Sequence, residues 1–414
     1  MSTHVRTLII GAGQAGLALS RCLTDRAHEH LVLDRGRVAE RWRSERWDSF
    51  RLLTPNWLTR LPGYRYTGGD PDGFMTGREV IDFFDGYARS FQPPVRTGVT
   101  VTAVEPGPRG WVVRIADREL LHAANVVVAV GHYNRPEIPD LAAHLPAEVH
   151  QLHSSEYRNP GLLPDGAVVV VGSGPSGQQV ADELAMAGRR VYLAVGRHRP
   201  LPRRYRGHDV YWWLDRTGML DRTVDTLPSA AVTRNAPSGV LAGEPRDLNL
   251  RRLVARGVVA AGRLAGVDGA RLTFAGDLPD RLAEADGNTQ RLLTRVDEYV
   301  RRAGLAASPP DRPDPPPAPW ADLAPRRLEL DRSRVSTVIW ATGYRRDYSW
   351  ISAPVFDADH EPVHRRGITP AAGLYFLGLR WLYRRKSNII DGVGPDAEYL
   401  AEHLSREPAT VSVG

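Results

Sequence analysis

The 414-residue chain contains a single cysteine, Cys22, and a single lysine, Lys386. One cysteine excludes an internal disulfide and a redox-active pair of the Cys-x-x-Cys kind. Because Cys22 lies in an apolar helical pattern, we expect it to be a small packed residue. The thirteen histidines show no zinc-ligand spacing, and no Gly-x-Ser-x-Gly segment occurs. The sequence therefore predicts neither a metal site nor a serine nucleophile.

Long apolar runs are also missing. The longest lie at 126–130 and 167–171, far short of the length that spans a bilayer. A strand pattern begins a few residues after Met1, which leaves no room for a signal peptide. We expect a cytoplasmic protein that makes no membrane contact.

The charge carries little information of its own. The net charge is +6, and the basic residues are scattered among acidic ones without a long block of one sign. We therefore expect no nucleic-acid partner, and the excess positive charge suits anionic small molecules. The length allows two or three domains, each with its own core.

Two glycine-rich segments of the same form, Gly11–Gly16 and Gly172–Gly177, are the most informative feature present. Each follows an apolar strand pattern and precedes a helical one, as the Gly-x-Gly-x-x-Gly loop of a dinucleotide site requires. Such a loop brings the backbone close to a pyrophosphate and directs a helix N-terminus at its negative charge. Two loops predict two dinucleotides on one chain.

The residues behind the loops distinguish the two sites. Asp34 lies eighteen residues after Gly16, where a carboxylate accepts hydrogen bonds from a ribose, so the first site suits FAD or NAD. Arg197 lies twenty residues after Gly177 and has no carboxylate beside it. A guanidinium there can pair with a 2′-phosphate, which favours NADP. The alternative is that Arg197 and Arg199 are surface side chains of an arginine-rich protein.

The order of the strand and helix patterns predicts an α/β fold with two Rossmann-like dinucleotide-binding domains, one inserted in the other. We expect a FAD-binding domain over residues 1–155 and 325–414. The NADPH-binding domain then comprises residues 156–324 and includes the Pro-rich segment 308–319, which we expect to be a loop.

Local signals predict where two helices begin. The segment Thr76-Gly77-Arg78-Glu79 has the form of a capping box and predicts an amphipathic helix over 77–91. Near the C-terminus, Gly394-Pro395-Asp396 predicts the entry to the last helix.

Further segments extend the pattern beyond the two loops. These are the region of Trp42, Leu52–Pro55, Ala341–Tyr344 and Gly392–Ala397. With them the chain resembles the flavin-containing monooxygenases, which are class B flavoprotein monooxygenases, and within that family the plant YUCCA-type enzymes and their bacterial relatives. The resemblance covers nearly the whole length. It implies FAD at the first loop, NADPH at the second, and an Ala-Thr-Gly turn that links the two domains.

The loop pattern and the resemblance together assign residues to the cofactors. Those expected to contact FAD or NADPH (NADP⁺) are Gly11, Gly13, Gln14, Ala15, Gly16, Asp34, Arg35, Trp42, Thr54, Gly131, Gly172, Ser173, Gly174, Pro175, Ser176, Gly177, Arg197, His198, Ala341, Thr342, Gly343 and Asn388.

Two departures from the family pattern concern the chemistry. The position of an asparagine that lies beside the flavin in many members falls on Leu53, and Asn56 replaces a lysine. Leu53 and Asn56 are therefore the catalytic candidates. In the family's Phe-x-Gly-x-x-x-His fingerprint, Ala147 and Val149 stand at the Phe and Gly positions, so His153 is either a hinge or cofactor contact or a structural histidine.

The resemblance implies a monooxygenase in which NADPH reduces FAD and O2 then forms a flavin C4a-hydroperoxide. This species would transfer one oxygen atom to a small nitrogen, sulfur or keto-acid substrate, and analogy with the plant relatives suggests an aromatic, indolic one. Two alternatives stay open: an NADPH oxidase or reductase that releases peroxide, and a flavin-bound sensing or interaction protein without turnover. The sequence also leaves open whether the chain forms a homo-oligomer.

Overall fold

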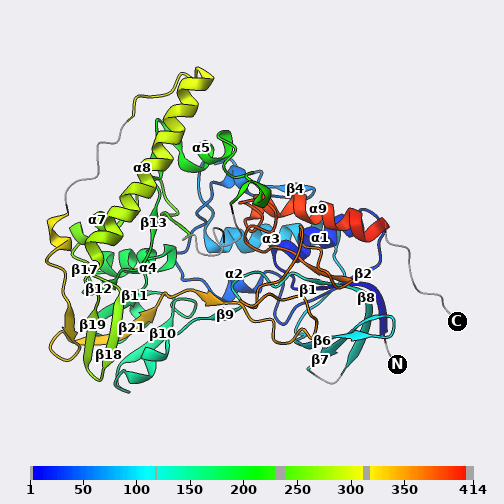
Figure 1. Cartoon of the computed structure of the whole chain (residues 1–414), viewed down its shortest axis with the longest axis horizontal. Helices are drawn as coiled ribbons and strands as arrows, with labels where there is room; N and C mark the ends of the chain where they lie inside the picture. The colour runs from blue at the N-terminus through cyan, green and yellow to red at the C-terminus, as the bar shows by residue number, and fades with distance from the viewer. Residues whose placement is uncertain (1–2, 117–118, 229–232, 234–237, 311–317, 407–414) are drawn as a thin grey trace.

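The computed structural model describes residues 3–116, 119–228, 233, 238–310 and 318–406. Its two main sheets lie side by side and are formed from different parts of the chain (Figure 1). Helices and strands alternate around both sheets, which confirms the predicted α/β class with two Rossmann-like units.

The first sheet has the strand order β5-β2-β1-β8-β7-β6, and β23 pairs with β8 as its seventh strand. Its strands are β1 (Thr3–Ile10), β2 (His30–Leu33), β5 (Val95–Arg96), β6 (Val101–Gly107), β7 (Gly110–Ile115), β8 (Leu120–Val128) and β23 (Leu374–Phe376). The central strand β1 is parallel to both of its neighbours. Strands covered on both faces are apolar throughout, which explains the continuous run at the end of β8.

The second sheet has the order β10-β21-β11-β12-β17, and all of its strands are parallel. Its strands are β10 (His150–His153), β11 (Ala167–Val171), β12 (Val191–Ala194), β17 (Val259–Ala261) and β21 (Val335–Trp340). Every residue of β11 is buried.

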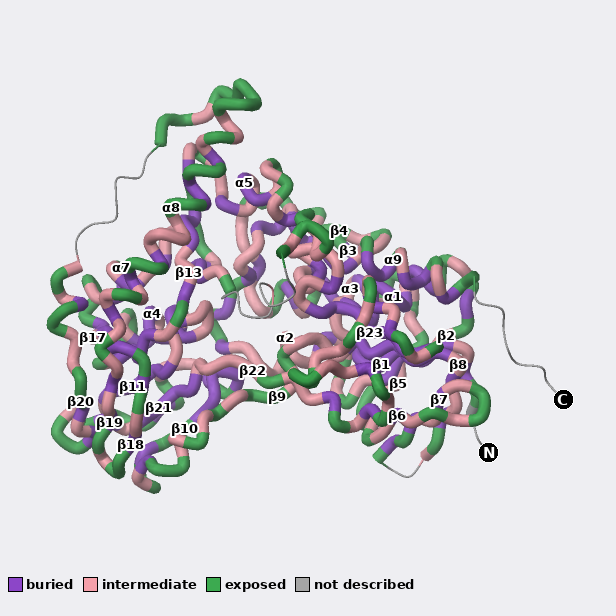
Figure 2. The backbone as a smooth tube through the Cα atoms, in the orientation of Figure 1, coloured by how far each residue is buried: buried purple, intermediate pink, exposed green. Residues whose placement is uncertain are grey.

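Helices cover both sheets. They are α1 (Gln14–Thr24), α2 (Glu40–Ser44), α3 (Gly77–Phe91), α4 (Pro175–Met186), α5 (Val210–Arg216), α7 (Leu250–Ala255), α8 (Leu278–Ala303) and α9 (Ile390–Arg406), with 3-10 turns at Asn56–Leu58, Asp140–His144, Pro160–Leu162, Val224–Thr226 and Pro319–Ala321. Helix α1 packs against α9 and α3, and α4 packs against α7. Helix α8 projects away from the second sheet (Figure 1). Buried positions gather in the sheets and on the helix faces that cover them (Figure 2).

Short strands complete the fold. They are β3 (Arg60–Leu61), β4 (Tyr64–Arg65), β9 (Arg135–Pro136), β13 (Arg199–Pro200), β14 (Arg204–Tyr205), β15 (His208–Asp209), β16 (Gly239–Val240), β18 (Leu264–Asp268), β19 (Arg271–Phe274), β20 (Arg327–Glu329) and β22 (Tyr344–Arg345). Among the helices in the described ranges, none is both long and apolar enough to cross a membrane.

Of the two predicted helix starts, the one at Gly77 is confirmed and the one at Pro395 is not. Helix α3 begins at Gly77 behind a capping box, in which Thr76 Oγ1 accepts from the Glu79 amide at 3.3 Å and Glu79 Oε2 accepts from the Thr76 amide at 2.8 Å. The predicted entry of the last helix at Pro395 is wrong, because α9 begins at Ile390 and contains that proline. Apolar packing of α9 on α1 outweighs the one backbone hydrogen bond that a proline removes.

The predicted domain boundaries at residues 155 and 325 stay a prediction, but two strands of the second sheet lie outside the predicted insertion of residues 156–324. Both β10 and β21 lie in the second sheet, where β21 pairs with β10 on one side and β11 on the other. The chain therefore crosses between the sheets in the stretch after β8 and again directly after β21. These two crossings run antiparallel and pair as β9 and β22, with Tyr344 opposite Pro136. Of the Pro-rich segment 308–319, residues 311–317 lie outside the described residues.

Candidate dinucleotide sites

The two glycine loops have the same backbone geometry. Gly11 has φ of 113° and Gly172 has φ of 110°, a region that favours glycine. A Cβ atom on Gly11 would lie 2.7 Å from the carbonyl oxygen of Ala129, and one on Gly172 would overlap that of Ala341. The first glycine of each loop is therefore required by both the turn and the neighbouring strand.

The other two glycines of each loop have opposite surroundings. A Cβ atom on Gly16 or Gly177 would overlap the carbonyl oxygen of the first glycine of its own loop, so these positions hold helix and strand close together. By contrast, nothing lies within 4 Å of a Cβ built on Gly13 or Gly174. Each middle glycine thus leaves an open space at the start of a helix, which a dinucleotide pyrophosphate would fill.

The helix N-termini at the loops carry no side-chain cap. Gly13 precedes α1 and Gly174 precedes α4, and neither first turn contains an acidic residue. The free N–H groups and the positive end of each helix dipole face the open space beside the middle glycine. Both helix starts therefore suit an anion.

The same hydrogen bonds hold both loops to their sheets. The Gly11 amide donates to Leu33 O at 2.7 Å, and the Gly172 amide donates to Ala194 O at 3.0 Å. The crossings begin in the same way, because Ala129 donates to Ile10 O and Ala341 to Val171 O, each at 2.8 Å. The two units are structural repeats, so Ala129-Val130-Gly131 is the counterpart of Ala341-Thr342-Gly343.

The acidic side chain behind the first loop reaches the loop itself. Asp34 Oδ2 accepts from the Ala12 amide at 2.6 Å and Oδ1 accepts from the Gly36 amide at 2.8 Å. The carboxylate is partly exposed and lies at the carboxyl end of β2, beside the N-terminus of α1. Arg35 next to it is exposed.

The residues behind the second loop are basic. Arg197 follows β12 and its side chain is exposed, whereas His198 is buried and its Nδ1 lies 3.1 Å from Gly196 O. Burial lowers the pKa of His198. Ser173 of the loop is also buried, and its hydroxyl donates to Gly196 O at 3.2 Å. In this arrangement Arg197 is the side chain free to meet a phosphate.

His153 joins the end of strand β10 to the second crossing. It is fully buried, with Nδ1 2.8 Å from Ser155 Oγ and Nε2 2.9 Å from Gly343 O. Its ring also lies edge-on to that of Tyr344. Both nitrogens have protein partners, which favours a structural histidine over a hinge or cofactor contact. Thr342 completes this junction because its hydroxyl donates to Glu137 O.

Asn56 holds a loop in place. Its Oδ1 accepts from the Met75 amide at 2.9 Å, its Nδ2 donates to Asp70 O at 2.9 Å, and the side chain is 4 % exposed. This geometry favours a structural role for Asn56 over the predicted catalytic one. Leu53 is partly buried, and its carbonyl oxygen accepts from Arg203 at 2.9 Å.

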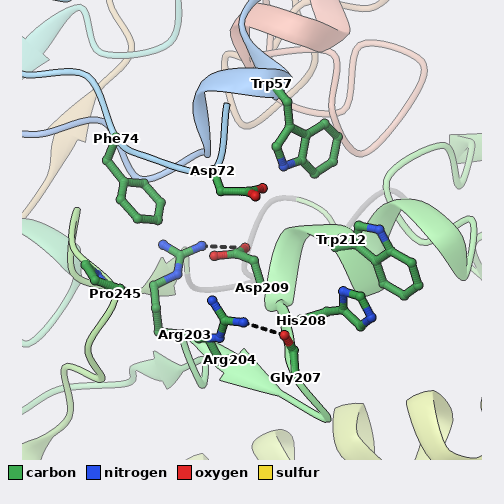
Figure 3. A pocket seen from close by; sticks show the side chains of 10 residues that line it. All are labelled: Trp57, Asp72, Phe74, Arg203, Arg204, Gly207, His208, Asp209, Trp212 and Pro245. Atoms are coloured by element: carbon green, nitrogen blue, oxygen red, sulfur yellow. Dashed lines mark hydrogen bonds and ion pairs between the residues drawn. The ribbon is translucent and has the colours of Figure 1, made fainter. Parts of the chain in front are cut away.

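Arg203 is a buried residue that no sequence motif marks. Its side chain is 1 % exposed, pairs with Asp209 at 2.7 Å, and donates across to Leu53 O in the other unit. Figure 3 shows Arg203 paired with Asp209 in a small pocket that Phe74, Trp57 and Trp212 also line. The segment 203–206 contains three arginines, Arg203, Arg204 and Arg206, and its sequence does not show that Arg203 is the buried one.

Several other residues that were expected to contact a cofactor contact other parts of the protein in the structure. Gln14 at the start of α1 donates to Asn388 O at 2.7 Å, which brings two predicted residues together from opposite ends of the chain. Trp42 packs on Phe84 and Phe50, with ring centroids 6.1 and 5.9 Å apart. Thr54 is partly buried and has no hydrogen bond from its side chain within the described part of the chain.

Among the described residues, no cluster of histidine, cysteine and carboxylate side chains could hold a metal.

A family model of pyridine nucleotide-disulphide oxidoreductases matches residues 8–214. The chain belongs to this family. Its only cysteine, Cys22, is buried in α1, and burial raises the pKa of the thiol. A member with this one inaccessible thiol has no dithiol of its own to pass electrons to a disulfide.

The chain is similar to an uncharacterized oxidoreductase over nearly its whole length, to a plant monooxygenase over part of it, and in fold to a solved flavin monooxygenase. An uncharacterized CzcO-like oxidoreductase of Geobacillus kaustophilus is 32% identical over 98% of this chain and 99% of the relative. Indole-3-pyruvate monooxygenase YUCCA1 of Oryza sativa subsp. japonica is 30% identical over 45% of this chain and 47% of that protein. A flavin-containing monooxygenase from Stenotrophomonas maltophilia has the same fold, with a TM-score of 0.65 at 17% identity over 97% and 98% of the two chains. The predicted resemblance is confirmed.

Proposed function

We propose that the protein is a monooxygenase that binds FAD at the first loop and NADPH at the second and inserts one oxygen atom from O2 into a small substrate. The observation that carries the proposal is the pair of equivalent loops, each with an open space beside an uncapped helix N-terminus. The different charges behind them, Asp34 and Arg197, support different nucleotides.

The proposed roles of the residues follow from their positions. The Gly13 and Gly174 backbones admit the two pyrophosphates, and the N-termini of α1 and α4 stabilise their charge. Asp34 would accept from the ribose of the FAD adenosine, and Arg197 would pair with the 2′-phosphate of NADPH. When bound, the flavin accepts a hydride from the nicotinamide and activates oxygen. The chain contributes binding, orientation and exclusion of water.

The proposal also assigns residues to an NADPH-binding unit and an FAD-binding unit. With β10 and β21 in the second sheet, we propose that the NADPH-binding unit extends from the β9 crossing to the β22 crossing. Residues before and after it would form the FAD-binding unit, and the paired crossings β9 and β22 would join the two units.

The test is a measurement of electron flow in purified protein loaded with FAD. We expect NADPH to reduce the flavin rapidly, and oxygen and NADPH consumption to rise together when a substrate is found among amines, thioethers and keto acids. Product labelled from ¹⁸O2 would identify insertion of the atom. Reduction without any stimulating substrate and with one peroxide released per NADPH would instead indicate an oxidase. A flavin that NADPH does not reduce would indicate a binding protein.

A further inference from the structure

The only lysine of the chain lies between two carboxylates that come from the two proposed units. Lys386 Nζ is 3.2 Å from Asp221, which follows α5, and 3.3 Å from Asp391 in the first turn of α9. Arg384 extends the row on one side, 3.6 Å from Asp221, and Arg60 of β3 extends it on the other, 2.5 Å from Asp391. The charges therefore alternate in sign along the row, and Lys386 is at its centre.

The two ends of this row differ in their exposure to water. The side chains of Asp391 and Lys386 are 4% and 11% exposed, whereas that of Asp221 is 49% exposed. A shielded ion pair is screened less by salt than an exposed one, so the bond between Lys386 and α9 is the firm part of the row. An ammonium group donates in three directions, which allows it to meet carboxylates on different sides.

The backbone of Lys386 is also fixed to both of these segments. Its amide donates to Leu220 O at 3.1 Å, next to Asp221. Its carbonyl oxygen accepts from the Ile389 amide at 2.9 Å, and a Cβ atom on Gly392 would overlap that oxygen. The turn into α9 therefore closes tightly on Lys386, so a displacement of Asp221 and its neighbours would also displace the start of α9.

The start of α9 borders the proposed FAD site. Gln14, the first residue of α1, donates to Asn388 O at 2.7 Å, and Asn388 follows Lys386 by two residues. Both Gln14 and Asn388 are predicted cofactor contacts, and α9 packs along α1. The position of Lys386 therefore bears on the side of the molecule that would hold FAD.

The other end of the row leads to the second loop. Leu220, next to Asp221, lies in one buried apolar cluster with Leu201 and Trp213. Leu201 follows Arg197, the proposed partner of the 2′-phosphate, by four residues. A nucleotide held at Arg197 would restrain this cluster and, through it, Asp221.

We propose that Lys386 is a positioning residue, through which NADP⁺ at the second loop strengthens the binding of FAD at the first. The inference rests on the proposed function, because it needs both cofactor sites. A link of this kind is a coupling free energy between two sites, so it is measured as the change that one ligand causes in the dissociation constant of the other.

The test starts from the FAD-loaded protein in its oxidised state. Dilution with and without saturating NADP⁺ gives the FAD dissociation constant from the fluorescence of released flavin. We expect NADP⁺ to lower this constant in wild type by about fivefold or more, and by no more than about twofold in Asp221→Asn and Lys386→Met. Without NADP⁺, Asp221→Asn should bind FAD like wild type. A direct titration should show that NADP⁺ still binds both variants.

Two further variants serve as controls. Asp225→Asn makes the same change at an exposed carboxylate of the same segment that forms no ion pair with Lys386, and it should keep the wild-type effect. Lys386→Arg keeps the charge and should retain the effect. Removal of Lys386 leaves the shielded carboxylate of Asp391 with one partner fewer, so melting temperatures identify a misfolded variant. Because Asp221 is half exposed, Asp221→Asn tests the link even where Lys386→Met does not fold.

Three results overturn the inference. The first is that NADP⁺ binds wild type and leaves the FAD dissociation constant unchanged. The second is that Asp221→Asn keeps the wild-type effect of NADP⁺, which would leave the row a structural contact. The third is that Asp225→Asn loses the effect as far as Asp221→Asn does. A wild-type protein that binds no NADP⁺ in the direct titration would instead contradict the proposed function, and the inference with it.

Discussion

At the scale of the residue, the two glycine loops differ in one charged side chain that lies behind each of them. The backbone of the two loops is repeated closely, so the loops alone give no preference between a flavin and a nicotinamide dinucleotide. The preference comes from Asp34 at the end of β2 and Arg197 after β12. A carboxylate suits a free ribose hydroxyl and a guanidinium suits a phosphate.

Replacement of Arg197 tests this assignment. Arg197→Ala should weaken NADPH binding by about tenfold to a hundredfold, because a charged hydrogen bond to the 2′-phosphate is lost. Binding of NADH, which lacks that phosphate, should change little. Dissociation constants of both nucleotides would be measured, with Arg65→Ala as an exposed arginine on β4 for comparison. Equal losses for NADPH and NADH would contradict the assignment.

A buried histidine gives the fold a dependence on pH. His28 is 5 % exposed, and its Nε2 lies 2.8 Å from Thr7 Oγ1. Burial, then repulsion from Arg6 and His30, lowers its pKa to about 4 from 6.5. Its contribution to stability is therefore complete above pH 6.5 and is lost as the pH falls through 4, by up to about 3 kcal/mol.

Urea unfolding between pH 7 and 4 checks this prediction. The free energy of unfolding should fall less steeply with pH in His28→Asn than in wild type. His144→Asn, at an exposed histidine, should keep the wild-type slope. If the slopes of wild type and His28→Asn coincide, the neutral state of His28 makes no contribution.

At the scale of the element, the sequence was most informative where structure depends on neighbouring residues. The two strand–loop–helix units and the capping box of α3 were predictable, because glycine spacing and the Thr76–Glu79 pair act over a few residues. The pairing of β10 with β21 was not predictable, since these strands lie far apart in the chain and β10 is short, with only one apolar residue. The counterpart relation of 129–131 and 341–343 also became visible only once both sheets were present.

Two glycines of the first loop allow the stability of the fold and the affinity for FAD to be tested separately. Gly16→Ala places a methyl group against the Gly11 carbonyl and should destabilise the protein by about 2–3 kcal/mol. Gly13→Ala meets no protein atom within 4 Å and should leave the stability of the cofactor-free protein nearly unchanged. Its methyl group would enter the proposed pyrophosphate space, so FAD affinity should fall. Melting temperatures without FAD and flavin titrations distinguish the two, and a tight FAD complex in Gly13→Ala would contradict the proposed site.

At the scale of the whole molecule, the two units are joined by polar contacts as well as by the crossings. Arg203 of the second unit reaches Leu53 O, and Glu183 of α4 accepts from Ser49 at 2.8 Å. An arginine-rich composition conceals such residues in the sequence. Nothing in the pattern around Arg203 distinguishes a buried guanidinium from a solvated one, because burial depends on segments that meet only in the folded chain.

Removal of Arg203 should disturb the relation between the units. Arg203→Gln leaves the carboxylate of Asp209 without its partner and removes the bond to Leu53, so we expect a loss of about 3 kcal/mol. Arg204→Ala at the exposed neighbour should cost no more than about 0.5 kcal/mol. Chemical unfolding of both variants measures the difference. If Arg203→Gln unfolds like Arg204→Ala, the buried pair is not part of what holds the units together.

The adjacent crossings have a consequence for how this architecture can change over evolution. Because Pro136 and Tyr344 face each other in one short ribbon, the intervening segment enters and leaves its host at nearly the same point. A module whose ends meet in this way can be exchanged as a cassette without stretching the protein around it. Specificity for the nicotinamide nucleotide would then be free to diverge while the flavin-binding host and the spacing between the two sites are conserved.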